Sequence, residues 1–131
     1  MLDTNILFSA CFYPSENIGI VFKTLEKGFE IYIAKHALDE LFKVTKRKKI
    51  DKEQEVNEFL KEIKYIPVST PANIENIPNI RDEKDRPILA AAIANDLDYL
   101  ITGDKDFLVL KDIVKKPKIF TMQEFIEKFS K

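Results

Sequence analysis

The sequence predicts a single α/β domain over residues 1–131, a three-layer sandwich whose mainly parallel sheet of about five short strands is flanked by helices. Strand-like apolar runs alternate with helix-like runs along the chain, which is typical of parallel strands joined by right-handed crossovers. The 131 residues, 45% hydrophobic and 33% charged, fit one ordinary domain with a core and a charged surface. The chain contains no repeat, low-complexity run or linker that would divide it.

The first half of the chain contains three runs that favour strands and three with helical spacing. The strands are expected at residues 1–4, 29–34 and 65–68, and the helices at residues 17–25, 35–45 and 51–63. The strand assignments rest on β-branched and aromatic residues. The first and third helices begin at Asn17 and Asp51, which can cap a helix N-terminus, and Gly28 is expected to end the first helix.

The second half begins with the longest loop, residues 69–84, and long loops inside compact domains are often functional. Asp85 follows this loop and can cap a helix with an apolar run that should be buried almost all round. Thr121 and Glu124 form the capping-box pattern of a terminal helix. The remaining elements are expected to be strands at residues 99–102 and 119–120 and a short helix at residues 105–110.

Charge and cysteine content exclude several classes of protein. The formal net charge of −1 excludes a nucleic-acid binder that depends on a generally basic surface, so a basic patch or a bound cation would have to attract a polyanion. One cysteine, Cys11, excludes an internal disulfide, and with one histidine, His36, a structural zinc site lacks ligands. We interpret both as ordinary packing or surface residues. No apolar run is long enough to span a membrane, and we expect a cytoplasmic protein.

Acidic residues fall where the predicted strands end or the following helices begin. They are Asp3, Glu40, Asp82, Asp85, Asp104 and Asp106. In open α/β sheets ligands bind outside the carboxyl ends of the strands, so these side chains are expected at one rim. Each alone has a plainer interpretation as a helix cap, a first-turn acid or a surface acid; Glu40, for example, could pair with Lys43. Asp3 is harder to explain in that way, because its neighbours are apolar and a buried carboxylate is costly.

The ligand types favour Mg²⁺ or Mn²⁺, because the cluster offers only oxygen atoms. Such ions clamp phosphate oxygens and lower the pKa of bound water, which suits hydrolysis of a phosphodiester. Asn5 and Thr102 are neutral and are expected to orient carboxylates or waters.

Four motifs in these segments resemble the PIN-domain family of Mg²⁺/Mn²⁺-dependent ribonucleases, which includes VapC-like toxins of toxin–antitoxin modules. The motifs are LDTNIL at residues 2–7, LDEL at 38–41, DEKDRPILAAA at 82–92 and LITGDKDF at 100–107. The resemblance implies an endoribonuclease that cleaves single-stranded RNA, a homodimer and a cognate antitoxin. It assigns the catalytic metal site to Asp3, Glu40, Asp85 and Asp104, with assistance from Asp82 and Asp106.

The sequence departs from the family pattern at its start, where only Met1 and Leu2 precede Asp3. Either the true start lies upstream, or the chain is trimmed, or the first strand is stunted. A stunted strand would leave its neighbours unpaired and Asp3 poorly fixed. A PIN-fold RNA- or protein-binding module with weak or no nuclease activity is the alternative function. A phospho-accepting receiver domain is disfavoured, because it offers no role for Glu40 and Lys118 poorly matches its required lysine.

The densest basic stretch, residues 43–52, begins at the end of the Glu40 helix. Its candidate substrate-binding residues are Lys43, Lys46 and Arg47, which could grip phosphates or simply form a solvated helix end. Phe12 and Tyr13 are expected in a loop after the first motif, where they could stack on bases, pack in the core or contact another subunit.

Overall fold

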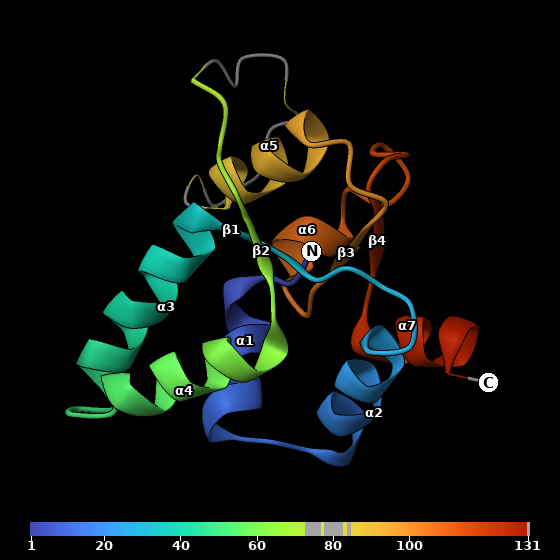
Figure 1. Ribbon diagram of the computed structural model, residues 1–131. Coiled ribbons are helices and arrows are strands. Elements are labelled where there is room, and N and C mark those ends of the chain that lie inside the picture. The colour runs from blue at the N-terminus through green and yellow to red at the C-terminus, as the bar shows by residue number, and fades with distance from the viewer. Residues whose placement is uncertain (73–76, 78–82, 84, 131) are drawn as a thin grey trace.

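Two parallel strand pairs form most of the sheet in the computed structural model, which describes residues 1–72, 77, 83 and 85–130 (Figure 1). Strand β1 (Tyr32–Ala34) pairs with β2 (Ile66–Val68). Strand β3 (Tyr99–Ile101) pairs with β4 (Lys118–Phe120). Both pairs are parallel, which confirms the predicted arrangement. Each strand has three residues and is therefore shorter than most of the runs in the sequence suggest.

The first three residues lie between the two strand pairs and join them. The amide of Leu2 donates to the carbonyl of Tyr32 at 3.2 Å, and Leu2 forms a parallel bridge with Ile101. The amide of Ile101 donates to the carbonyl of Met1 at 2.9 Å. The expectation of unpaired neighbours around a stunted first strand is therefore wrong, because this short segment bonds to β1 on one side and to β3 on the other.

Helices surround the strands in packed groups, as Figure 1 shows. Helices α1, α3 and α4 pack on one another, α2 packs on α7, and α5 contacts β1 and α3. Their bounds are α1 (Thr4–Phe12), α2 (Glu16–Leu25), α3 (Lys35–Lys48), α4 (Glu53–Ile63), α5 (Arg86–Ala94), α6 (Lys105–Leu108) and α7 (Met122–Phe129). No helix among the described residues is long and apolar enough to span a membrane.

Helix α1 is the main difference from the expected elements. The segment expected to be a loop at Phe12 is instead the last turn of this helix, and Tyr13 is its C-terminal cap. The carboxylate of Asp3 caps its N-terminus by accepting from the amide of Ile6 at 2.9 Å. Asp3 thus ends the central strand segment and starts α1. This helix continues through Phe12, where a loop was expected.

Two helix starts also differ by a few residues from those expected. Ser15, not Asn17, caps α2 by accepting from the amide of Ile18. Lys52, not Asp51, is the N-cap of α4, and it makes no side-chain capping bond. Asp51 instead lies in the preceding turn with a φ of 63°, a left-handed conformation that aspartate tolerates better than most residues. The capping box of Thr121 and Glu124 at α7 is confirmed.

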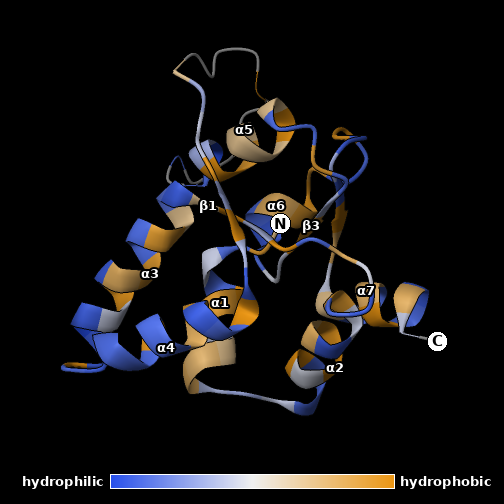
Figure 2. Ribbon diagram, viewed as in Figure 1, coloured by the Kyte–Doolittle hydropathy of each residue, from blue (hydrophilic) through white to orange (hydrophobic). Residues whose placement is uncertain are grey.

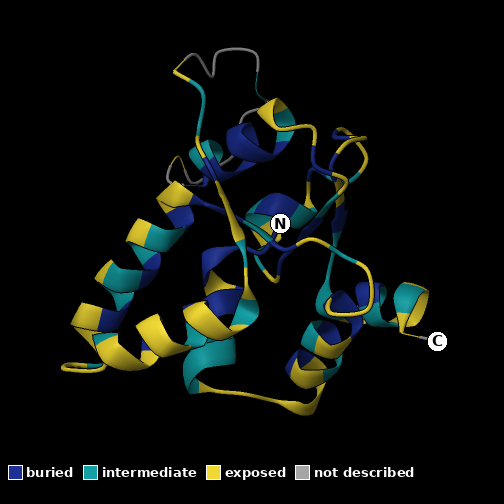
Figure 3. Ribbon diagram, viewed as in Figure 1, coloured by how far each residue is buried: buried dark blue, intermediate teal, exposed yellow. Residues whose placement is uncertain are grey.

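The core is continuous across the strands and the inner helix faces. Helix α5 is buried over five consecutive residues, Ile88 to Ala92, as its all-round apolar pattern predicts (Figures 2 and 3). Aromatic rings of Phe29, Tyr99, Phe125 and Phe129 contact one another with centroids 5.0–6.3 Å apart, which ties α7 to β3. This packing anchors β3 at its amino end, opposite the end that the acidic residues follow.

Candidate metal centre

Asp3 is buried at the carboxyl end of the central strand segment, with 3% of its surface exposed. One carboxylate oxygen accepts from the Ile6 amide, and the other accepts from the hydroxyl of Thr102. Its side chain is therefore held by a helix N-terminus on one side and by β3's end on the other. The expectation that Asp3 would be poorly fixed is wrong.

The environment of Asp3 opposes its negative charge. Burial raises the pKa of this carboxyl from 3.8 to about 6, although hydrogen bonds from Thr102 and Ile6 act in the opposite direction. The nearby carboxylates of Asp104 and Glu40 also raise it. No cationic group among the described residues contributes to that balance, so this part of the site has a deficit of positive charge that a bound cation would relieve.

Asp104 and Asp106 lie at the start of α6, directly after β3. Asp104 caps that helix by accepting from the amide of Asp106 at 2.9 Å, and its own amide donates to Thr102 at 3.0 Å. Asp85, 7% exposed, occupies the N-cap position of α5. Asp85, Asp104 and Asp106 each place a carboxylate oxygen within 4.8 Å of the others, although they come from two separate chain segments. We name these three residues the aspartate trio.

Asp104 connects the trio to the rest of the acidic rim. It belongs to the trio and also acts electrostatically on Asp3, whereas Glu40 of α3 acts on Asp3 from another side. Glu40 is half-buried on the helix that follows β1. The structure thus brings Asp3, Glu40, Asp85 and Asp104 to the carboxyl ends of the strands, as the topology requires. Their catalytic and metal-binding roles stay a prediction.

The supporting residues fall in different places. Thr102 is fully buried and bonds both Asp3 and Asp104. Asn5 is exposed in the first turn of α1, and no hydrogen bond to another described residue places it on the acidic rim. Asp106 is a full member of the trio, a closer position than the sequence could indicate. Asp82 lies outside the described residues.

A divalent cation fits the donor set of this rim. The ligand atoms on offer are carboxylate oxygens, with the Thr102 hydroxyl beside them, and hard cations such as Mg²⁺ and Mn²⁺ prefer such oxygens. Three carboxylates within 4.8 Å of one another repel strongly unless a cation or protons compensate them.

The basic stretch lies along α3, beyond Glu40. A groove of about 330 Å³ on one side of that helix is lined by His36, Asp39, Glu40, Lys43, Val44 and Arg47. Lys46 is exposed on the same helix but does not line the groove. His36, interpreted from the sequence as an ordinary surface residue, lies four positions before Glu40. That spacing, one helical turn, is the signal that could have placed it beside the rim.

The aromatic candidates lie at the far end of α1 from Asp3. The ring of Tyr13 is 57% exposed, contacts Phe8, and is covered by the Lys49 ammonium at 4.6 Å from its centroid. Phe12 is partly buried against the core. The nine residues of α1 separate Tyr13 from Asp3 by roughly 15 Å along the helix axis. These rings are therefore remote from the acidic rim.

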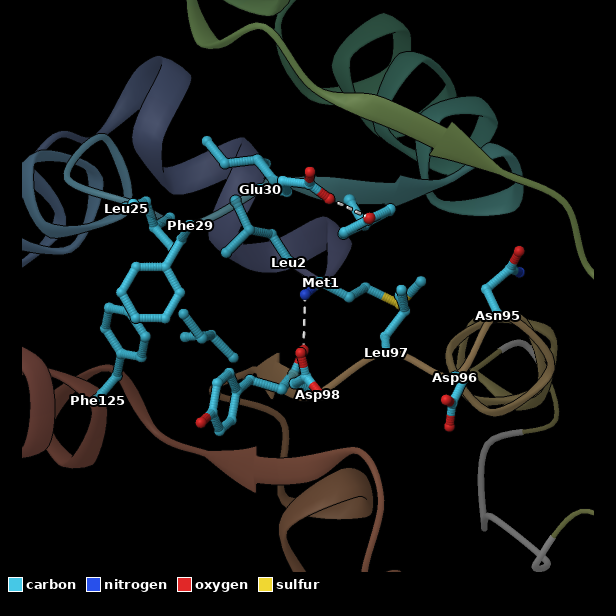
Figure 4. A pocket seen from close by; sticks show the side chains of 15 residues that line it. Met1, Leu2, Leu25, Phe29, Glu30, Asn95, Asp96, Leu97, Asp98 and Phe125 are labelled. Carbon is cyan, nitrogen blue, oxygen red and sulfur yellow. Dashed lines mark hydrogen bonds between the residues drawn. The ribbon is translucent and has the colours of Figure 1, made fainter.

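Another pocket lies at the opposite ends of the strands and contains none of the proposed metal ligands. It has a volume of about 440 Å³, with apolar side chains such as Leu25, Phe29 and Phe125 and acidic ones at Asp96 and Asp98 (Figure 4). The Met1 amine donates to the Tyr99 carbonyl at 2.7 Å beside it. Among the described residues, the carboxylate cluster that could hold a metal ion lies at the acidic rim and not at this pocket.

Comparison with known proteins agrees with this architecture. A family model described as PIN domain matches residues 1–106. A solved structure of VapBC2 from Rickettsia felis, bound to a DNA fragment from their promoter, superimposes with a TM-score of 0.66 at 23% sequence identity, covering 92% of this chain and 95% of the other. At that identity the likeness concerns the fold alone. No curated protein matches the sequence.

Proposed function

Because this chain belongs to the PIN-domain family, we propose that it is a Mg²⁺- or Mn²⁺-dependent endoribonuclease that cleaves phosphodiester bonds of single-stranded RNA. The aspartate trio carries the proposal, since oxygens of Asp85, Asp104 and Asp106 converge within 4.8 Å. The buried Asp3 supports it, because its raised pKa indicates a carboxylate whose charge this site does not balance.

We assign the metal ligands to Asp3, Glu40, Asp85 and Asp104, with Asp106 beside them. When bound, the cation lowers the pKa of a water molecule and offsets negative charge on the phosphate. Neighbouring residues orient the proposed ligands: the Thr102 hydroxyl donates to one Asp3 carboxylate oxygen, and the Ile6 amide donates to the other. The cap bond to the Asp106 amide fixes the Asp104 carboxylate. Asp82, in the same motif as Asp85, remains a proposed supporting residue on sequence grounds.

We further propose that the chain is the toxin of a toxin–antitoxin module, acting as a homodimer with a cognate antitoxin. The support for this part is the VapBC2 structure, a toxin–antitoxin complex whose fold is similar. The proposal predicts that an antitoxin, when coexpressed, relieves growth inhibition caused by this chain. Growth inhibition that persists at full antitoxin expression would contradict it.

The nuclease proposal is tested by cleavage of single-stranded RNA with purified protein in Mn²⁺ and in EDTA. We expect Mn²⁺-dependent cleavage that Asp85→Asn and Glu40→Gln abolish while far-UV circular dichroism and the melting temperature stay near those of the wild type. Glu58→Gln is the matched control, because Glu58 is exposed on α4 and does not line the groove beside Glu40. Equal cleavage by Asp85→Asn would refute the proposal, and tight RNA binding without turnover would favour a binding module.

A further inference from the structure

The groove on α3 leads away from the acidic rim and changes from acidic to basic along its length. Its lining residues His36, Glu40, Lys43 and Arg47 are spaced four, three and four positions apart. At about 100° per residue, these four side chains fall within about 60° of one another around the helix. They therefore form one continuous strip along the helix.

The strip begins at the site and ends in cationic side chains. Glu40 lies on α3, which begins directly after the carboxyl end of β1, so this end of the groove lies at the acidic rim; Glu40 also acts electrostatically on Asp3. Arg47 follows Glu40 by seven residues, or roughly 10 Å along the helix axis. Both Lys43 and Arg47 are exposed, so their cationic groups are accessible to a polyanion that extends from the rim.

We infer that this groove holds the RNA strand on one side of the scissile bond, with Lys43 and Arg47 binding its backbone phosphates. The inference rests on the proposed nuclease function and specifies the substrate contacts of the same site. A chain with a net charge of −1 attracts a polyanion only through a local patch, and this groove provides one next to the carboxylates. Asp39 lines the groove as well and keeps phosphates towards the Lys43 and Arg47 end.

The groove lining does not include Lys46. This side chain is exposed and carries the same charge as Lys43 and Arg47, and it lies about 100° around the helix from Arg47. The sequence alone grouped Lys43, Lys46 and Arg47 as one basic stretch. The structure separates two of them from the third, and this separation supplies a matched control.

The test measures binding of a short fluorescein-labelled oligouridine RNA by anisotropy, in an Asp104→Asn background that is expected to prevent cleavage. We expect Lys43→Ala and Arg47→Ala each to weaken binding about fivefold near 0.1 M salt, and to reduce the slope of log affinity against log salt by about 0.7. Lys46→Ala should cause a much smaller change in both quantities. Melting temperatures of all three variants should match, because the side chains are exposed.

A second measurement uses RNA cleavage by protein that retains Asp104. Lys43→Ala and Arg47→Ala should raise KM with little change in kcat, whereas Lys46→Ala should leave both near the wild-type values. Shortening the substrate on one side of the cleaved bond should also raise KM. The same shortening should not raise KM further in the Lys43→Ala/Arg47→Ala double variant, because that variant lacks the side chains that bind the removed nucleotides.

Three outcomes would overturn the inference. They are equal weakening by Lys46→Ala, unchanged RNA affinity in the double variant, and equal sensitivity of the double variant and wild type to shortening. Unchanged RNA affinity in the double variant would indicate that the groove binds an acidic protein segment and not RNA. Failure of the nuclease proposal is distinguishable, because it appears as missing Mn²⁺-dependent cleavage while RNA binding still depends on Lys43 and Arg47.

Discussion

The hydroxyl of Thr102 donates a hydrogen bond to the carboxylate of Asp3, joining residues 99 positions apart in the sequence. The same hydroxyl oxygen accepts from the amide of Asp104. A threonine hydroxyl has a single proton, so this pair of bonds directs that proton towards Asp3. One buried side chain therefore sets the orientation of one proposed ligand and the backbone position of another.

We expect Thr102→Val to weaken Mn²⁺ binding by about 10- to 100-fold, the usual loss when a residue that orients a metal ligand is removed. Valine keeps the shape of threonine but cannot donate to Asp3. Thr102→Ser should retain most of the affinity, because it retains the hydroxyl. Mn²⁺ titrations followed by electron paramagnetic resonance would measure both, and wild-type affinity in Thr102→Val would show that the hydroxyl has no orienting role.

The stability of the metal-free protein should fall as pH rises from about 4 to 7. Burial raises the pKa of Asp3 to about 6 in the folded chain, so folding favours its protonated form. That contribution is fully present below the unfolded value of 3.8 and is lost as pH rises through about 6. The shift of about two pKa units corresponds to roughly 3 kcal/mol in the free energy of unfolding.

Urea unfolding of the wild type and of Asp3→Asn, at both ends of this pH range in EDTA, would measure the effect. The difference between the two proteins isolates Asp3 from other titrating groups. Asp3→Asn should be the more stable protein at neutral pH, and Mn²⁺ should stabilise only the wild type substantially. Parallel pH curves for the two proteins would contradict the predicted contribution of Asp3.

Asp104→Asn should impair cleavage more than Asp106→Asn. Asp104 belongs to the aspartate trio and also raises the pKa of Asp3, whereas Asp106 belongs to the trio but is not among the groups that shift the pKa of Asp3. Asparagine can still cap α6 at position 104, so the comparison tests charge and not helix formation. Single-turnover rates in saturating Mn²⁺ would compare the variants, and a larger loss in Asp106→Asn would reverse the proposed order of importance.

Glu124→Ala should destabilise the protein by about 1 kcal/mol, because it removes half of the α7 capping box. The Glu124 carboxylate accepts from the Thr121 amide at 2.9 Å and pairs with Lys111. Glu124→Gln keeps an acceptor and loses only a partly exposed ion pair, so its cost should be smaller. Thermal unfolding would compare the two variants, and equal losses would assign the stabilisation to the ion pair.

The ion pair also gives Glu124 a pH dependence of the opposite sign to that of Asp3. Its pKa is lowered, first by the hydrogen bond from Lys111 and then by the Thr121 amide. The corresponding stability is present above the unfolded value of 4.5 and is lost as pH falls through the lowered pKa.

The sequence predicts an element well where its local pattern, such as an apolar run or a capping motif, matches the structure that forms there. Helix α5 follows from its apolar run with Pro87 in the first turn, and α7 follows from the capping box at Thr121. Helix α1 was not predicted, because its residues are apolar on nearly all sides and give no helical period. The capping role of Asp3 was hidden by its interpretation as a metal ligand alone.

Strand order correctly indicated which rim collects the acids, but could not indicate which carboxylates meet. Asp106 joins the trio because the Asp104 cap turns the chain sharply into α6, a side-chain geometry that spacing does not encode. Likewise, the sequence groups Lys43, Lys46 and Arg47 as one basic stretch, and the structure shows that Lys43 and Arg47 line the groove while Lys46 does not. The short start of the chain suggested a loose Asp3, whereas helix capping and Thr102 fix it.

Asp3 has a structural role and a proposed functional role, and this affects how saturation mutagenesis of this chain would be interpreted. Because its carboxylate both starts α1 and faces the acidic rim, most substitutions there should lower cellular abundance and activity together. Glu40 is half-buried within α3 and caps no helix, so its substitutions should reduce activity while abundance persists. An abundance screen run beside an activity screen would therefore separate residues that build the fold from those that only perform the reaction, with Asp3 scoring in both.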